Sequence, residues 1–361
     1  MLLTLDGAFY RRLAVTAAAI IVYRLGCAVP VPGLSADMVG ELARSSGLPP
    51  TSVSVCALGV LPLITVLILA ELLRTIVPGM RRWEQASPGN RELAGYAIIT
   101  LALATAAVQA TGLAGALEGV SRLVIEPGGL FRTTTVATMV GGVALLIALA
   151  GIIDRAGIGY GVLLLFLAPT LVELPRNLAL IADAYSVGTY PFSSVALAGL
   201  FTALSVAAIV GLLLAARGAE LVSAACVWPL LIAYTLLAWV LFGIGMAVTG
   251  NLDQAAAYLA PGSAVRYGAL AAIVILTVWL YVRAGRIAGL PSPVPAAPIA
   301  AALAAIALTA ETLQAQLQTA LPLGAVHVVV AAVVATGILL RWSSAPSSDA
   351  DHAAQSSGLN R

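Results

Sequence analysis

Charged side chains inside long apolar stretches are the residues of this chain best placed to do chemistry, because a charge in hydrocarbon is costly and usually serves a function. Glu71 and Arg74 are three residues apart, so both can lie on one face of a helix and pair. The others, each near the end of an apolar stretch, are Arg24, Asp154, Arg155, Glu173, Arg176 and Glu311. Pairing or snorkelling at a membrane interface explains these residues better than a proton relay does.

Known catalytic and metal-binding patterns do not occur in the sequence. His327 lies in the last apolar stretch without neighbouring ligands, which favours a role in helix packing. The glycine-rich run 157–161 follows no predicted strand, so it indicates a tight turn between two helices rather than a phosphate loop. The chain also contains no lysine, which a Walker phosphate loop requires. We therefore expect no catalytic residue, no metal and no cofactor.

The three cysteines, Cys27, Cys56 and Cys226, are widely spaced in apolar sequence. Their spacing predicts neither a disulfide framework nor a zinc site. We expect all three to be buried as small apolar side chains.

The composition excludes an ordinary soluble protein. Of the 361 residues, 61% are hydrophobic and only 9% are charged, whereas soluble domains carry roughly 25% charged residues. A membrane-spanning helix takes about 20 apolar residues, so the chain has room for roughly ten spans. The net charge of +2 gives no sign of nucleic-acid binding.

Apolar stretches separated by charges or by proline and glycine clusters predict ten membrane helices. They cover about residues 13–30, 54–77, 93–113, 134–153, 159–181, 193–216, 223–247, 266–283, 294–311 and 321–341. If the N-terminus is cytoplasmic, the inner loops and tail carry twelve arginines and the outer loops carry five. The positive-inside rule therefore predicts that both termini are cytoplasmic. The polar tail, 342–361, is predicted to be disordered.

Prolines interrupt three of the predicted helices. Pro62 lies in the second, Pro169 and Pro175 in the fifth, and Pro229 in the seventh. A proline in a membrane helix frees backbone groups, often beside a cavity or a moving interface. This pattern is typical of a transporter or a channel.

Four motifs occur in order between residues 11 and 180. Arg11-Arg12-Leu13 leads through Arg24-Leu25-Gly26 to Val29-Pro30-Val31-Pro32-Gly33-Leu34. The next are Ala57-Leu58-Gly59-Val60-Leu61-Pro62-Leu63-Ile64, then Arg91 with Tyr96 and Gln109, then Asp154-Arg155 before Gly157-Ile158-Gly159-Tyr160-Gly161. In this order they resemble the first five helices of the SecY family, the protein-conducting channels. Over 193–341 the resemblance rests on helix number and Pro229.

The resemblance implies an all-α polytopic membrane fold with two inverted, pseudo-symmetric halves, 1–190 and 191–341, around an hourglass pore. In the family, a ring of aliphatic side chains narrows the pore, blocks ions and yields to an extended peptide. Carried onto this sequence, the ring is Val60, Ile64, Val162, Phe166, Leu231 and Val329. The family opens sideways to lipid between its second and seventh helices, and the polar residues of this lateral gate correspond to Thr65, Gln109 and Ser223.

The sequence departs from the family in its loops. The plug between the first two helices is reduced to Ser35–Val53. The two basic cytoplasmic loops that dock the ribosome or the SecA motor shrink to 217–222 and 283–297, and the second keeps Arg283 and Arg286 as partner contacts. Tyr160 stands where the family's turn has Asn.

The sequence thus predicts a divergent SecY-like translocase channel subunit in a bacterial inner membrane, a passive path for preproteins that a partner drives. The implied partners are a SecE-like membrane subunit, a preprotein, the lipid bilayer and a SecA motor or ribosome, with no nucleic acid. Two alternatives stay open. One is a small-molecule secondary transporter, which needs a polar site at the membrane midplane. The other is a non-conducting accessory or relic homologue that has lost its docking loops.

Overall fold

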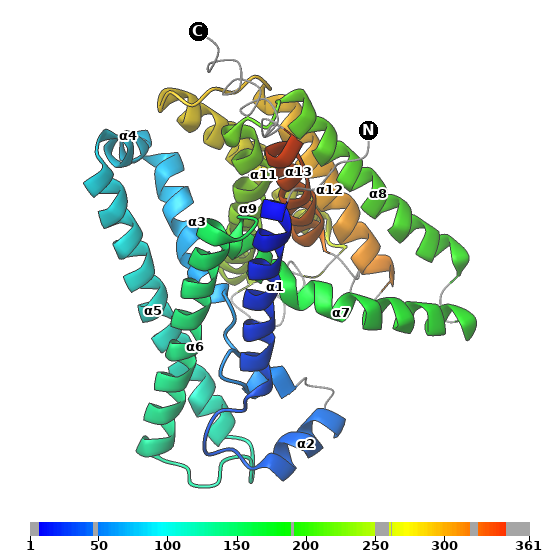
Figure 1. Cartoon of the computed structure of the whole chain (residues 1–361). Helices are drawn as coiled ribbons and strands as arrows, with labels where there is room; N and C mark the ends of the chain where they lie inside the picture. The colour runs from blue at the N-terminus through cyan, green and yellow to red at the C-terminus, as the bar shows by residue number, and fades with distance from the viewer. Residues whose placement is uncertain are drawn as a thin grey trace.

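The computed structural model describes residues 7–45, 50–188, 191–249, 260, 262–317 and 324–343, and within these ranges the fold is helical without a strand (Figure 1). The helices are α1 (Gly7–Ala28), α2 (Ala36–Ser45), α3 (Leu61–Ile76), α4 (Pro78–Ala86), α5 (Pro88–Glu118), α6 (Gly129–Ala156), α7 (Gly161–Ser186), α8 (Phe192–Ala215), α9 (Glu220–Thr249), α11 (Ala264–Ile287), α12 (Ala296–Leu317) and α13 (Ala325–Ser343). A 3₁₀ turn, η1 (Pro50–Val53), follows α2. The predicted all-α class is confirmed.

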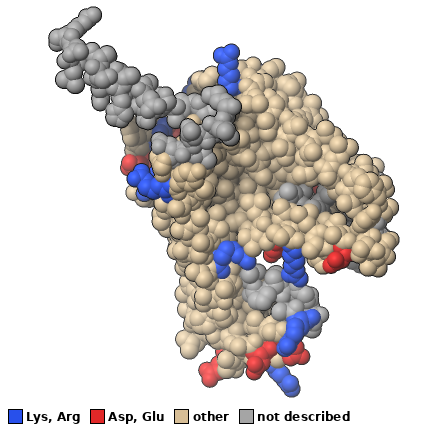
Figure 2. Space-filling model, turned by 45° about the vertical axis from the view of Figure 1, so that its right-hand side comes forward, with Lys and Arg blue, Asp and Glu red and all other residues tan. Residues whose placement is uncertain are grey.

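Most of the ten predicted spans are long, apolar helices. In the part of the chain that the structure describes, eight helices are long and apolar enough to cross a membrane, or nine if α3 and α4 form one broken span. The helix that corresponds to the first predicted span, α1, carries Arg11, Arg12 and Arg24. Large areas of the surface are correspondingly free of charge (Figure 2).

Several predicted boundaries are corrected by the structure. Pro62 lies in the first turn of α3 rather than inside a span, at a position where its missing N–H leaves no hydrogen bond unmade. The shortened loop predicted at 217–222 is shorter still, because α9 begins at Glu220. Arg283 and Arg286 belong to α11 and not to the loop that follows it. The first two residues of the predicted disordered tail belong to α13. Residues 344–361 lie outside the described residues.

The other predicted prolines lie where the sequence indicated. Pro169 and Pro175 are inside α7, and Pro229 is inside α9. In Figure 1, α7 runs sideways from the centre of the molecule and α8 returns along its outer edge.

The helices form two packed groups that are joined through α3 and through α7, which contacts both α6 and α13. In the first group, α5 packs against both α3 and α6, and α6 packs against α1. In the second, α11 packs against α9 and α12, and α13 packs against α8 and α9. The helix α3 also contacts α9 and α11, and one large apolar core joins residues of both groups.

Small side chains allow the close packing of α5. Ala102, Ala106, Ala110 and Ala114 recur every four residues and are fully buried on one face of this helix. Because lipid gives no hydrophobic driving force between helices, such small residues let backbones approach and gain dispersion energy. The alanine-rich composition therefore serves packing in this helix.

The run 157–161 forms the predicted tight turn between α6 and α7. The N–H groups of Gly157 and Gly159 both donate to the Ile153 carbonyl, and the Gly161 N–H donates to Asp154 Oδ1 at 2.6 Å. Gly159 has a φ of 87°, a conformation that suits glycine. A Cβ on Gly161 would collide with the backbone carbonyl of Ala150, so this position admits only glycine without a shift.

We predict that Gly161→Ala lowers the free energy of unfolding by about 1–3 kcal/mol, because the added methyl group must displace backbone. Gly151→Ala is the matched control, since a Cβ at this position of α6 meets no atom within 4 Å. Its effect is expected to be neutral or stabilising by up to about 1 kcal/mol. Unfolding in mixed detergent micelles measures both, and equal losses would contradict the packing argument.

Candidate functional site

Two cavities lie on either side of a short apolar layer. The Tyr160 cavity, of about 790 Å³, is lined by residues of α7, α8, α9 and α13 and of the turn after α8, among them Tyr160, Arg217, Ser223 and Arg341. The His327 cavity, of about 290 Å³, is lined by Arg24, Cys56, Val60, Phe166, Glu173 and His327 among others. Each cavity thus combines charged and apolar side chains.

The helix α7 passes from one cavity to the other. Leu163 lines the Tyr160 cavity and Leu165 lines the His327 cavity. With a rise of about 1.5 Å per residue, the boundary between the cavities on α7 is only a few ångströms deep.

The same boundary between the two cavities can be placed on three neighbouring helices. On α13, His327 lines one cavity and Val333 the other, so Val329 lies between them. On α9, the Tyr160 cavity ends at Trp228, three residues before Leu231. On α3, Leu61 lines the His327 cavity and Ile64 follows one turn later. The apolar layer therefore receives residues from α3, α7, α9 and α13.

All six predicted ring residues belong to the large apolar core of the molecule or pack against it. Val60, Ile64, Leu231 and Val329 are buried members of the large apolar core. Val162 and Phe166 are half-buried and pack against the same core. Their role as a pore ring stays a prediction, because clustering alone is also what apolar residues of a core would show.

His327 packs against the layer. Its ring stacks on that of Phe166, with 5.0 Å between centroids and 5° between planes. This agrees with the expected helix-packing role, and it also gives the His327 cavity an imidazole wall. Within the described residues, no group of three His, Cys, Asp or Glu side chains gathers to hold a metal.

The predicted gate residues are spread over three helices. Thr65 on α3 and Gln109 on α5 are exposed, and the Thr65 hydroxyl donates to the Leu61 carbonyl of its own helix at 2.9 Å. Ser223 on α9 lines the Tyr160 cavity, and its hydroxyl donates to the Ala219 carbonyl. Their role at a gate stays a prediction.

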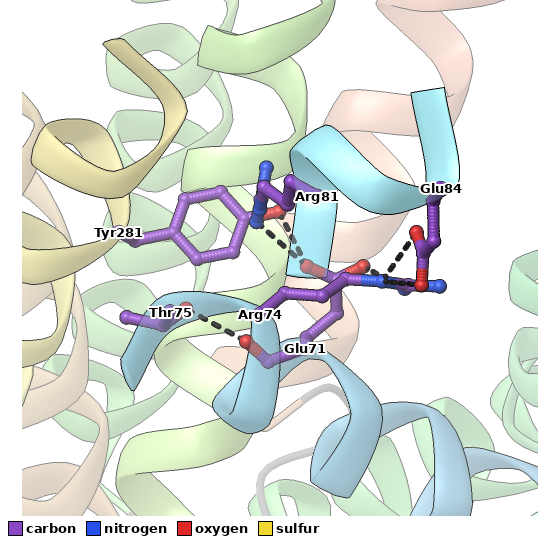
Figure 3. Close-up of polar contacts among 6 residues, drawn as sticks. All are labelled: Glu71, Arg74, Thr75, Arg81, Glu84 and Tyr281. Atoms are coloured by element: carbon purple, nitrogen blue, oxygen red, sulfur yellow. Dashed lines mark hydrogen bonds and ion pairs between the residues drawn. The ribbon is translucent and has the colours of Figure 1, made fainter. Parts of the chain in front are cut away.

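Five side chains form an ionic cluster at the end of α3 (Figure 3). Glu71 pairs with Arg74 at 2.6 Å, as its spacing predicts, and also with Arg81 of α4 at 2.9 Å. Arg74 Nε pairs in turn with Glu84 at 3.0 Å. The Tyr281 hydroxyl of α11 donates to Glu71 Oε2 at 3.0 Å, and the Arg81 guanidinium lies 4.6 Å from the Tyr281 ring centre.

The cluster explains the bend between α3 and α4, which is 107°. The bend turns Arg81 and Glu84 back over the end of α3, where two carboxylates and two guanidinium groups balance each other. Arg81 is only 8% exposed, so it depends on this pairing. Sequence reasoning missed Arg81, Glu84 and Tyr281, since helical spacing predicts only partners within one helix.

Five further charged residues of the predicted set are either paired between helices or exposed. Glu311 on α12 is 3% exposed and pairs with Arg266 of α11 at 2.7 Å, which confirms the expected pairing. Glu173 and Arg176 are exposed on α7. Arg283 and Arg286 are exposed on the last turns of α11, near Ile287, whose carbonyl accepts from Arg82 of α4.

Residues 54–284 match the SecY family model, which is more than half of the chain. The chain belongs to the SecY family. The predicted resemblance is therefore confirmed, and the match extends beyond residues 11–180 into the second group of helices.

Curated relatives match the sequence of this chain over part of their own length. The protein translocase subunit SecY of Escherichia coli K12 is 30% identical over 189 residues, which cover 48% of this chain and 42% of the relative. The same subunit of Thermus thermophilus is 31% identical over 186 residues, which cover 46% and 42%. The chain therefore spans less than half of the length of these relatives.

The fold of nearly the whole chain matches that of solved structures. A structure of a protein-conducting channel superposes with a TM-score of 0.55 at 16% identity and covers 95% of this chain and 93% of its own. Sec61 in the canine ribosome–channel complex gives a TM-score of 0.59 at 16% identity, with the same coverage. At this identity the likeness establishes the fold alone.

We predict that Glu71→Ala lowers the free energy of unfolding by about 3 kcal/mol, because it leaves Arg74 and Arg81 buried without their shared carboxylate. Glu84→Ala is the matched control, since Glu84 pairs with Arg74 alone in the cluster. We expect it to cost about half as much. Unfolding in mixed detergent micelles compares the two, and a smaller loss for Glu71→Ala would contradict its central position.

Proposed function

We propose that this chain is a SecY-like translocase channel subunit, a passive and laterally gated path for preproteins across or into a bacterial inner membrane. The observation that carries the proposal is the apolar layer between the Tyr160 and His327 cavities, within a SecY-family fold. Val60, Ile64, Val162, Phe166, Leu231 and Val329 form its pore ring.

The physical basis is the poor wetting of a narrow apolar ring. Water and ions avoid it, while flexible aliphatic side chains can part around an extended peptide. An apolar segment of that peptide leaves sideways between α3 and α9, since lipid is its better solvent. Thr65, Gln109 and Ser223 supply polar contacts at this exit, each worth about 1 kcal/mol.

The arginine bias supports an orientation with both termini in the cytoplasm. The Tyr160 cavity then opens inward, and the His327 cavity opens outward. A SecE-like membrane subunit clamps the two halves, and the energy comes from a SecA motor or a ribosome. Arg283 and Arg286, exposed on α11, are the contacts for that partner.

A second candidate is a non-conducting accessory homologue. It is favoured by the turn between α8 and α9, which is reduced to 216–219. So short a turn offers little surface for a motor or a ribosome to bind. An accessory protein keeps the fold and the SecE-like partner but moves no substrate.

Reconstitution separates these two functions. With a SecE-like subunit and a motor in vesicles, we expect the chain to protect a secretory substrate from protease. Arg283→Ala combined with Arg286→Ala should lower the protected fraction severalfold, whereas Arg176→Ala, also exposed but on α7, should not. Absence of protection together with no copurified translocase subunit would support the accessory function.

Ion leak tests the ring directly. Ile64→Asn places an amide in the apolar layer, so we expect it to wet the constriction and raise vesicle conductance severalfold. Leu69→Asn is the matched control, because Leu69 lies on the same helix but is exposed. Equal conductance of the two variants would place Ile64 outside the pore.

A further inference from the structure

Two of the three cysteines meet in space. Cys27, at the end of α1, and Cys56, just before α3, are both buried and free. The Cys56 thiol and the Tyr23 hydroxyl lie beside the Cys27 sulfur. The separation of the two cysteines in the sequence hid this contact, which the structure creates by folding the intervening segment back on itself.

A short antiparallel ladder brings the two cysteines together. The Val31 N–H donates to the Val53 carbonyl, and the Val55 N–H donates to the Val29 carbonyl, both at 2.9 Å. This ladder closes the segment that contains α2 and η1, and the cysteines lie at its base. A bond between them would therefore join the two ends of that segment.

Gly26 makes the approach possible. A Cβ on this residue would lie 2.6 Å from Cys56 Sγ, so any other side chain would push Cys56 away from α1. Cys27 and Cys56 also line the His327 cavity, which gives a small oxidant a route to them. Cys226, by contrast, is buried in α9 and lines neither cavity.

We propose that Cys27 and Cys56 are a disulfide-forming pair that fastens the base of the 28–55 segment beside the His327 cavity. The inference rests on the proposed orientation for its setting, because only the outer side of a bacterial inner membrane is oxidising. The closed bond fixes the start of α3 to the end of α1, and the open pair releases it.

The oxidant is a small disulfide-bonded molecule such as glutathione disulfide. One protein thiolate attacks a sulfur of the oxidant and expels its first thiol, and a mixed disulfide forms. The second protein thiolate then attacks the protein sulfur of that bond and expels the other thiol. The two cysteines lose two electrons and two protons, and the oxidant gains both as two thiols.

Mass spectrometry of the full chain in detergent tests the pair. Glutathione disulfide should remove two hydrogens from the reduced protein. Tryptic digestion without reductant should then link Leu25–Arg44 to Ser45–Arg74, which hold Cys27 and Cys56. Cys27→Ser and Cys56→Ser should each abolish the link, Cys226→Ser should leave it intact, and Gly26→Ala should slow it severalfold.

Three results would overturn the pair: no linked peptide, a link to the Cys226 peptide Gly218–Arg266, or a link only between two copies of the chain. Trapping free thiols in cells before lysis tests the setting, where we expect the bond to be present. A pair that links in detergent but stays reduced in cells would overturn the outward orientation in the proposed function and leave the pairing itself supported.

Discussion

The absence of water from the bilayer core is the constraint on which this structure depends. A charge there must be paired, moved to a helix end or placed in a cavity. The buried Glu311 pairs with Arg266, the Glu71 cluster balances its charges at a helix end, and Arg24 and Glu173 line the His327 cavity. The charged residues of this apolar chain therefore mark where helices are joined or where a cavity lies.

This constraint also separates what the sequence predicts from what it hides. Spacing of three residues predicts the pair Glu71–Arg74, and the glycines predict the turn at 157–161, because both depend on local backbone geometry. The partners Arg81 and Tyr281 depend on a 107° bend and on a helix about 200 residues away, so spacing carries no signal for them. The contact between Cys27 and Cys56 cannot be predicted from spacing for the same reason. The ring residues are predicted only through the resemblance to the family, since an apolar residue in an apolar chain carries no signal of its own.

The ionic cluster constrains how the proposed gate can work. Glu71 belongs to α3, and its partner Tyr281 belongs to α11, so the cluster ties the two helix groups at one end of the proposed exit. Separating α3 from α11 at this point would leave buried charges with fewer partners, which is expensive in a low dielectric. Beyond the cluster, the contacts of α3 with the second group are apolar and can be exchanged for lipid at little cost.

These attachments make α3 a helix held at its two ends. Its last turns are fixed by Glu71 and Arg74, and the residues before it are fixed to α1 by the ladder and by the contact of Cys56 with Cys27. Ile64 lies between the two attachments, in the apolar layer. In the proposed gate, a helix held in this way would open by pivoting about its ionic end, because dispersion contacts reform in lipid whereas ion pairs do not. In the proposed channel, the state of the proposed cysteine pair would set how far the start of α3 can swing, and this would link the His327 cavity to the width of the apolar layer.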